Sequence, residues 1–475
     1  MEDSWQKQND AVRALMHDFV DRVVDMYSTM DARPVSKVPS AETLARAAAQ
    51  EIPADGRALA DVYEEMREEI YAHTILAQHP RFFACVPSTA SLLSWMGEAM
   101  TAAYNPHASC QINAPVADLI EKKLVRWLCD AAGYPEGAGG LFVSGGSMAN
   151  LTALVAARDA KLSADARGRA VVYLSDQTHS SVAKALTIIG FGKEQVRLVA
   201  TDADFRMDMG ALAAAVAADK AAGRKPFAVV ASAGTTNTGS VDPLEAIADL
   251  CAKEDMWLHV DGAFGASVLL STSHRARLSG IERADSLSWD AHKWLLQTFG
   301  CGIVLVRNCQ TLINSFVAHP EYLKDVENDE DGIEFWDLGP ELTRPARALK
   351  LWLTLQTMGT DAVGRAIDHG FALAEAAESL LAARDGWEIV SHAQLGVVNF
   401  RYVGDGTLDE DALALINARI SQDVSADGFA MVFTTELRGK KVLRLCTIHP
   451  ETTFEDVRRT VDKILDAQAH VTTKK

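Results

Sequence analysis

Short apolar runs alternate with helical stretches through the middle of the chain, and this alternation constrains the fold more than any other feature. We expect strands at seven such runs, at 141–143, 171–174, 196–199, 227–230, 257–260, 286–289 and 303–306. The stretches between them repeat apolar residues at helical spacing. Strand–helix alternation predicts βαβ units, and therefore an α/β fold with a mostly parallel seven-stranded sheet flanked by helices. Because ligands bind at the carboxyl ends of such strands, polar residues that follow the runs are candidate site residues.

The parts of the chain that flank this alternation have other patterns. Residues 1–80 are helical in pattern, and the apolar stripes over 12–30 and 57–73 find no partner within that segment. We expect this N-terminal helical segment to pack on a second subunit. We expect a large domain over 81–360 and a small C-terminal α+β domain over 361–475.

Two features of the C-terminal third complete this division. Strand patterns at 396–400 and 442–445 alternate with helical patterns at 408–425 and 453–467, which is typical of an α+β domain. The segment 319–340 is acidic and has no apolar period. It is therefore predicted to be a mobile surface loop.

Charge and composition exclude several classes of function. The 46 Lys and Arg residues stand against 64 Asp and Glu, and the net charge of −18 repels nucleic acid. We find no uncharged apolar run of about 18 residues and no signal-peptide pattern, so we expect no membrane segment. Seven scattered cysteines indicate reduced thiols. We therefore expect a cytoplasmic enzyme, and no metal ion.

Two charged residues follow predicted strands directly. Lys293, within Asp290-Ala291-His292-Lys293-Trp294, follows the run at 286–289 and is either a nucleophilic amine or a structural lysine. Asp261 follows the run at 257–260, and the small residues after it leave room for a flat ligand. Its carboxylate suits a metal, a ribose or a protonated ring nitrogen, or else caps the next segment.

Three further segments after predicted strands carry polar groups. Gly145-Gly146-Ser147 opens a helix, where backbone N–H groups and the helix dipole form an anion site. The same residues nearly fit the nucleophile elbow of serine hydrolases, with Ser147 as nucleophile, so that alternative stays open. His179 and Thr236 follow two other strands. Each is by itself as consistent with a structural role as with a functional one.

Taken together, these residues call for a single ligand with an anionic group, a ring nitrogen, an aldehyde and a flat ring face. Pyridoxal 5′-phosphate has all four. The chain resembles the group II pyridoxal-phosphate decarboxylases of fold type I, and most closely the aromatic L-amino acid decarboxylases. Three motifs carry the resemblance in order: Ser175-Asp176-Gln177-x-His179-Ser180-Ser181, His259-Val260-Asp261-x-Ala263 and His292-Lys293-Trp294.

The resemblance implies a role for each catalytic position. Lys293 would form the Schiff base with the cofactor, beside its usual neighbour His292. Asp261 would pair with the pyridine N–H and keep it protonated. Ala263 would lie under the ring, and His179 would stack on the opposite face and contact the substrate.

The resemblance also implies the cofactor's other contacts. Gly146 and Ser147 match the phosphate-binding pair, and Thr236 matches a threonine behind the ring. Asp290 and Ala291 stand where the family usually has Asn and Pro. A carboxylate near a phosphate repels it unless screened, so Asp290 departs from the family's phosphate-side hydrogen bond.

A loop tyrosine and a homodimer follow from the same resemblance. Tyr322 lies 29 residues after Lys293 and matches the loop tyrosine of the decarboxylases. This tyrosine would protonate the substrate's α-carbon, on a loop that closes over the neighbouring subunit's active site. The implied enzyme is therefore a homodimer with shared active sites.

The segment Cys85-Val86-Pro87-Ser88 resembles the substrate wall of the family. Cys85 and Val86 replace aromatic residues common in the animal enzymes, which enlarges the pocket. An apolar wall favours an aromatic side chain over a carboxylate, because a buried charge needs a partner. Thr343 aligns with a position that bears on indole versus phenol preference in plant relatives, and its hydroxyl favours phenolic substrates.

The resulting hypothesis is decarboxylation of an aromatic L-amino acid, of the tyrosine, DOPA, tryptophan or phenylalanine type, to the amine and CO₂. Glutamate or 2,4-diaminobutyrate decarboxylation on the same scaffold remains an alternative. An aromatic acetaldehyde synthase would lack Tyr322, and a non-catalytic paralogue would lack Lys293 or Asp261. A serine hydrolase using Ser147 is the remaining alternative.

Overall fold

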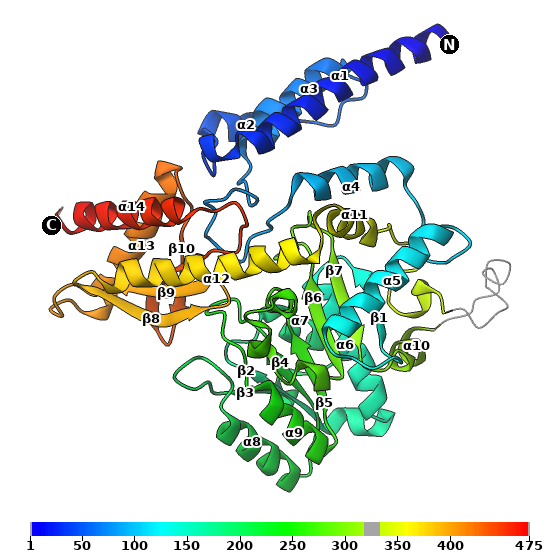
Figure 1. Ribbon diagram of the computed structural model, residues 1–475, viewed down its shortest axis with the longest axis vertical. Helices are drawn as coiled ribbons and strands as arrows, with labels where there is room; N and C mark the ends of the chain where they lie inside the picture. Colours follow the sequence, from blue (N-terminus) through cyan, green and yellow to red (C-terminus); the bar gives the residue numbers. More distant parts are fainter. Residues whose placement is uncertain (1, 318–332, 474–475) are drawn as a thin grey trace.

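A seven-stranded sheet forms the centre of the molecule in the computed structural model, which describes residues 2–317 and 333–473 (Figure 1). Its strands are β1 (Gly139–Val143), β2 (Ala170–Ser175), β3 (Val196–Val199), β4 (Lys225–Ser232), β5 (Trp257–Asp261), β6 (Ser286–Asp290) and β7 (Gly302–Val306). They lie in the order β1-β7-β6-β5-β4-β2-β3. Only β7 runs against its neighbours β6 and β1 within this sheet. The prediction of a mostly parallel sheet of seven strands is confirmed.

Helices cover both faces of this sheet, which explains why its strands are apolar along their whole length. Phe142 packs with the face covered by α5, α8 and α9, whereas Leu141 and Val143 pack with the face covered by α6 and α7. Successive side chains of a strand therefore enter different cores. The helices beside the sheet are α5 (Pro115–Ala131), α6 (Gly146–Lys161), α7 (Ser180–Ile188), α8 (Met209–Ala221), α9 (Leu244–Glu254), α10 (Gln310–Phe316) and α11 (Ala348–Met358).

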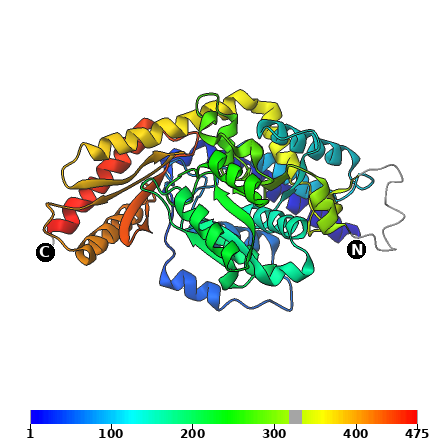
Figure 2. The same ribbon diagram turned by 90° about the horizontal axis from the view of Figure 1, so that it is seen from below.

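A four-stranded antiparallel sheet and three helices form the C-terminal part, at one end of the molecule (Figure 2). The elements are α12 (Thr360–Ala382), β8 (Trp387–Gln394), β9 (Val397–Tyr402), α13 (Glu410–Asp427), β10 (Phe433–Leu437), β11 (Lys440–Cys446) and α14 (Phe454–Thr473). The strand patterns at 396–400 and 442–445 correspond to β9 and β11. β8 and β10 have no counterpart among the predicted strands. They are the edge strands and are mostly exposed or half-buried, so they lack an apolar run.

The N-terminal helices lie to one side of this body (Figure 1). They are α1 (Glu2–Ser28), α2 (Ala41–Ala48) and α3 (Leu59–Glu65), followed by α4 (Leu92–Tyr104). The stripe predicted over 57–73 continues beyond α3 as a π-helical turn and a 3₁₀ turn. Phe19 of α1 makes an edge contact with Trp95 of α4, with ring centroids 5.9 Å apart. The division of the chain at residues 80 and 360 stays a prediction.

The predicted surface loop 319–340 falls largely outside the described residues. In its described part the prediction is wrong, because Phe335–Asp337 forms a buried 3₁₀ turn. The ring of Phe335 lies under the guanidinium of Arg344, 4.8 Å from ring centroid to carbon, and Trp336 donates to the carbonyl of Ser109. These contacts with residues outside the turn bury a segment that has no apolar period of its own. Among the described helices, none has the length and apolar character needed to cross a membrane.

Candidate active site

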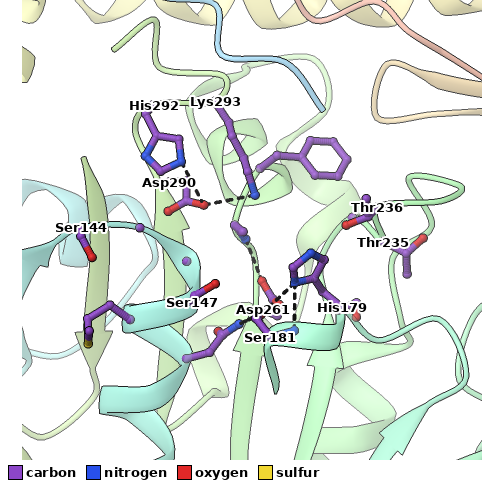
Figure 3. Close-up of a pocket in the computed structure, with 18 residues that line it drawn as sticks. Ser144, Ser147, His179, Ser181, Thr235, Thr236, Asp261, Asp290, His292 and Lys293 are labelled. Atoms are coloured by element: carbon purple, nitrogen blue, oxygen red, sulfur yellow. Dashed lines mark hydrogen bonds and ion pairs between the residues drawn. The ribbon is translucent and has the colours of Figure 1, made fainter. Parts of the chain in front are cut away.

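A cavity of about 310 Å³ opens at the carboxyl ends of the strands of the large sheet (Figure 3). The segments after β1, β2, β4, β5 and β6 contribute its lining, as expected for a parallel sheet. The structure places all nine predicted cofactor residues in this lining: Gly146, Ser147, His179, Thr236, Asp261, Ala263, Asp290, His292 and Lys293. Their individual roles remain predictions, but their convergence from five separate loops is a property of the fold.

Asp261 ends β5 with a buried carboxylate that is held on both oxygens. Its Oδ1 accepts from the Ser288 hydroxyl and from the Ala263 backbone N–H, each at 3.1 Å. Its Oδ2 accepts from Asn150 Nδ2 at 3.0 Å. These neutral donors stabilise a negative charge without neutralising it. The carboxylate is therefore preorganised to hold a proton on a ring nitrogen.

Asn150 is a site residue that sequence analysis did not single out. Its two amide hydrogens go to Asp261 Oδ2 and to the Ser181 hydroxyl, at 3.0 and 3.1 Å. Its oxygen therefore accepts from His259 Nε2 at 2.9 Å, while His259 Nδ1 contacts the Ser286 hydroxyl at 2.8 Å. Its spacing in the sequence could have indicated this role, because Asn150 lies four residues after Gly146 and therefore faces the same side of α6.

His259 is held in its neutral form by this network. Burial lowers the pKa of His259 to about 4, although the nearby Asp261 carboxylate acts in the opposite direction. The ring proton lies on Nε2, since Asn150 offers only its oxygen there. The position and charge of Asp261 thus depend on a buried chain from Ser286 through His259 and Asn150.

This buried histidine predicts a loss of stability in acid. The pKa of His259 is about 4 in the folded protein and 6.5 ordinarily, so the unfolded chain binds the extra proton as the pH falls below 6.5. Stability is therefore lost between those two values, by up to about 3 kcal/mol for this group. His259→Gln retains a donor and an acceptor but does not titrate.

We expect the His259→Gln variant to lose correspondingly less stability than the parent between about pH 7 and pH 4.5. Denaturant unfolding at several pH values measures this difference. His470→Gln, which changes an exposed histidine of α14, serves as the matched control and should keep the parent's acid dependence. Equal acid losses in the parent and His259→Gln would contradict the assignment of a neutral buried ring.

His179 lines the same cavity, and its ring is oriented by α7. Nδ1 accepts from the Ser181 backbone N–H at 3.2 Å and contacts the Ser181 hydroxyl at 2.8 Å. When the ring carries a single proton, that proton lies on Nε2, the nitrogen with no partner among the described residues. Figure 3 shows the ring beside Ser181 and Asp261. His179 can therefore offer a ring face and one N–H donor to a ligand.

The turn after β6 brings three titratable side chains together. Lys293 Nζ lies 3.1 Å from Asp290 Oδ2, and His292 Nε2 lies 3.6 Å from the same oxygen. His292 Nδ1 accepts from the Cys301 backbone N–H at 3.3 Å. Burial lowers the pKa of His292, so this ring is neutral at pH 7. Asp290 is thus the ion-pair partner of Lys293.

The amino end of α6 forms a cradle for an anion beside Asp290. Gly146 begins the helix, and Ser147 follows with its hydroxyl on the cavity lining. A β-carbon at Gly146 would lie 2.8 Å from Asp290 Oδ2 and 3.3 Å from the Ala263 β-carbon. Only glycine leaves this space open. The free N–H groups of the first helical turn and the helix dipole favour a phosphate at this point.

The C-terminal part of the chain supports the loop that carries Thr236. Arg444 donates to the Thr236 carbonyl at 2.6 Å. Asn399 donates to the Asn237 carbonyl at 3.0 Å, and the Thr435 hydroxyl donates to the Asn237 side chain at 2.9 Å. The small sheet therefore fixes a wall of the cavity whose other walls come from the large sheet.

The predicted substrate-wall residues do not line this cavity within one chain. Ser88 donates to the Gln297 carbonyl at 3.2 Å, which places its segment against the turn after Lys293. Cys85 is exposed, and the lining contains neither Cys85, Val86, Pro87 nor Ser88. Thr343 is also exposed and away from the lining. Tyr322 lies outside the described residues.

Ser147 lacks the geometry of a hydrolase nucleophile. A serine nucleophile needs a histidine base within hydrogen-bond reach. Among the described residues no histidine hydrogen-bonds to Ser147: His179 Nδ1 is engaged by Ser181, and His292 Nε2 faces Asp290. The serine-hydrolase alternative therefore has no support from the site.

Comparison with known proteins identifies the family. The family model described as "Pyridoxal-dependent decarboxylase conserved domain" matches residues 41–403. The chain belongs to this family. The decarboxylase is 41% identical to the aromatic-L-amino-acid decarboxylase of Bacillus atrophaeus, over 98% of this chain and 97% of that protein. It is 33% identical to the L-2,4-diaminobutyrate decarboxylase of Rhizobium meliloti, over 87% and 83% of the two chains.

The fold of this pyridoxal-dependent decarboxylase matches a solved relative closely. A crystal structure of Oryza sativa TDC with PLP and tryptamine has a TM-score of 0.90 and 30% sequence identity, covering 97% of this chain and 98% of that one. The expectations of a fold type I enzyme, of amino-acid decarboxylation and of pyridoxal phosphate as cofactor are confirmed.

The cavity of this decarboxylase fits that cofactor. The cradle at Gly146 and Ser147 suits the phosphate, and the buried Asp261 carboxylate suits a protonated ring nitrogen. Lys293 supplies the amine that can hold the aldehyde carbon. When bound, the cofactor supplies an electron-accepting ring that takes up the electron pair left by departing CO₂.

Proposed function

We propose that the enzyme decarboxylates an aromatic L-amino acid to the corresponding amine and CO₂. The observation that carries the proposal is the 41% identity to an aromatic-L-amino-acid decarboxylase across nearly the whole of both chains. The cavity lining supports it, because Lys293 is the one Lys or Arg among the described lining residues, and it already pairs with Asp290. A substrate with a carboxylate side chain would need a second cation.

The residues divide the chemical work as follows in this proposal. Asp261, held by Asn150 and Ser288, keeps the proton on the ring nitrogen and so maintains the electron sink. Lys293 holds the cofactor and displaces the product amine. His179 covers the ring face and directs its Nε2–H into the cavity. Gly146 and Ser147 fix the phosphate.

A panel of amino acids tests the substrate class. We expect CO₂ release from L-tyrosine, L-DOPA, L-tryptophan or L-phenylalanine to exceed that from L-glutamate and L-2,4-diaminobutyrate in kcat/KM. Higher kcat/KM for diaminobutyrate or glutamate would overturn the aromatic assignment, while leaving the decarboxylase family unaffected.

Tyr322 is proposed to supply the proton to the substrate's α-carbon, on the strength of its spacing from Lys293. Tyr322→Phe removes the donor and keeps the ring, so CO₂ should still leave. The reaction should then turn toward oxidation, in which amino acid, O₂ and water give aldehyde, CO₂, ammonia and H₂O₂. Amine, CO₂ and O₂ uptake are measured together. An unchanged ratio of amine to CO₂ would show that another group delivers the proton.

A homodimer with shared active sites is part of the proposal. The apolar side chains Val12, Met16, Val20 and Val24 of α1 remain 39–53% exposed in the single chain, and such a stripe is typical of a buried interface. Val20→Asp with Val24→Asp should yield a monomer in sedimentation and abolish turnover. Asp21→Asn, on the same helix, is the control. An active monomer at micromolar concentration would contradict the dimer.

A further inference from the structure

Asp290 combines two features that are at odds with a phosphate-binding site. The residue is 2% exposed, and its Oδ1 has no hydrogen-bond partner among the described residues. Both oxygens border the glycine cradle, since an added β-carbon at Gly146 would lie 2.8 Å from Oδ2 and one at Gly145 would lie 4.0 Å from Oδ1. A phosphate in this cradle would bring up to about two negative charges beside a buried carboxylate. The two groups repel each other unless one takes up a proton.

The free protein balances the charge of Asp290 with Lys293, whose Nζ lies 3.1 Å from Oδ2. The cofactor would engage that same amine, so Lys293 would no longer present a free ammonium group to Asp290. The other titratable groups near Asp290 do not replace it. Asp261 at the end of β5 is itself a carboxylate and brings no positive charge. Burial raises the pKa of the Cys301 thiol to about 12, so this group is uncharged. Lys350 is already paired, because it donates to the carbonyl of Phe299 and forms an ion pair with Glu98. The residues of α6 that line the cavity are all uncharged.

His292 is the remaining candidate for an added proton, and its geometry opposes one. Its Nδ1 accepts the Cys301 backbone N–H at 3.3 Å, and its own backbone N–H donates to the Cys301 carbonyl at 3.1 Å. A proton on Nδ1 would point at the Cys301 N–H, which is itself a donor. The backbone hydrogen bond between His292 and Cys301 holds the two groups in this position. Its other nitrogen, Nε2, already carries the ring proton and faces Asp290 Oδ2 at 3.6 Å. The unpartnered oxygen of Asp290 has no such obstacle.

We propose that Asp290 takes up a proton when the cofactor binds, and that its O–H then donates a hydrogen bond to the cofactor phosphate. The carboxyl group changes from a partner of Lys293 into a neutral donor, similar in shape to an asparagine amide. The proposal rests on pyridoxal phosphate as cofactor and is independent of which amino acid is decarboxylated. It makes cofactor affinity proton-linked through a residue of this chain.

Binding of pyridoxal phosphate to the apoenzyme tests the linkage. The ratio of the Kd of the parent to that of Asp290→Asn should rise with pH between about pH 6 and pH 9, approaching about tenfold per pH unit. The comparison cancels the titration of the cofactor's own groups. Asp285→Asn, which changes the carboxylate just before β6 that accepts from the Leu258 N–H, is the control and should keep the parent's pH dependence. A ratio that does not change with pH overturns the proposal.

A second variant and a direct measurement separate the donor role from a general effect of charge. Asp290→Ala should bind with a pH dependence like that of Asp290→Asn but more weakly, because it has no donor. The infrared difference spectrum of cofactor binding should contain the C=O band of a protonated carboxyl group, and Asp290→Asn should lack it. Absence of that band in the parent would place the proton on the phosphate and overturn the proposal. Neither measurement requires a substrate, so the outcome is separate from that of the proposed function.

Discussion

Lys293→Ala should abolish steady-state decarboxylation while leaving cofactor binding in place. Lys293 is the one Lys or Arg among the described lining residues, so no neighbouring side chain can replace its amine. The phosphate cradle and Asp261 remain intact in the variant. We expect kcat to fall by at least about 10²–10⁴-fold, the range for loss of a group that moves protons in the reaction.

Absorbance of the bound cofactor and product release measure the two halves of this prediction. Borohydride should fix a pyridoxyl group on Lys293 of the parent and on no residue of the variant. Lys463→Ala, which removes a surface ion pair with Asp427, is the matched control and should retain full activity. Turnover by Lys293→Ala at the parent's rate would show that another residue holds the cofactor.

Asp261→Asn should have the second largest effect. The amide can occupy the same space but carries no charge to hold the proton on the ring nitrogen, so the electron sink weakens. We expect a loss of about 3–4 kcal/mol of transition-state stabilisation, or roughly 10²–10³-fold in kcat, as for other charge-stabilising groups in dry sites. Substrate KM should change much less, because the interaction matters most when charge develops on the ring.

Steady-state kinetics with the absorption spectrum of the bound cofactor checks this prediction. Asp285→Asn is again the control, since Asp285 accepts from the Leu258 N–H at 2.8 Å at the far end of the same strand. It should lower stability and leave kcat unchanged. A change of less than about threefold in Asp261→Asn would mean that Asp261 does not hold the ring nitrogen.

Much of the large sheet follows from local pattern. Strands buried on both faces must be apolar throughout, so runs such as 227–230 and 303–306 are visible without any knowledge of their neighbours. Edge strands do not share this constraint. β8 and β10 each have one unpaired side in the small sheet and keep polar side chains, so their sequences resemble loops. The buried turn at Phe335 was not predicted, because its burial depends on contacts with Arg344 and Ser109. Both residues lie outside the turn, and no local periodicity marks these contacts.

The candidate site likewise has some features that follow from local sequence and others that depend on the tertiary structure. The sequence alone determined that Lys293, Asp261 and His179 belong to one cavity, because each follows a predicted strand and parallel strands end at one edge. Only the tertiary structure decided that Asn150 and His259 hold Asp261, and that Asp290 pairs with Lys293 while its second oxygen stays unpartnered. Strand ends are set by local apolar runs. Side-chain hydrogen bonds require atoms of separate elements within about 3 Å of each other, which depends on how α6 packs across β5 and β6.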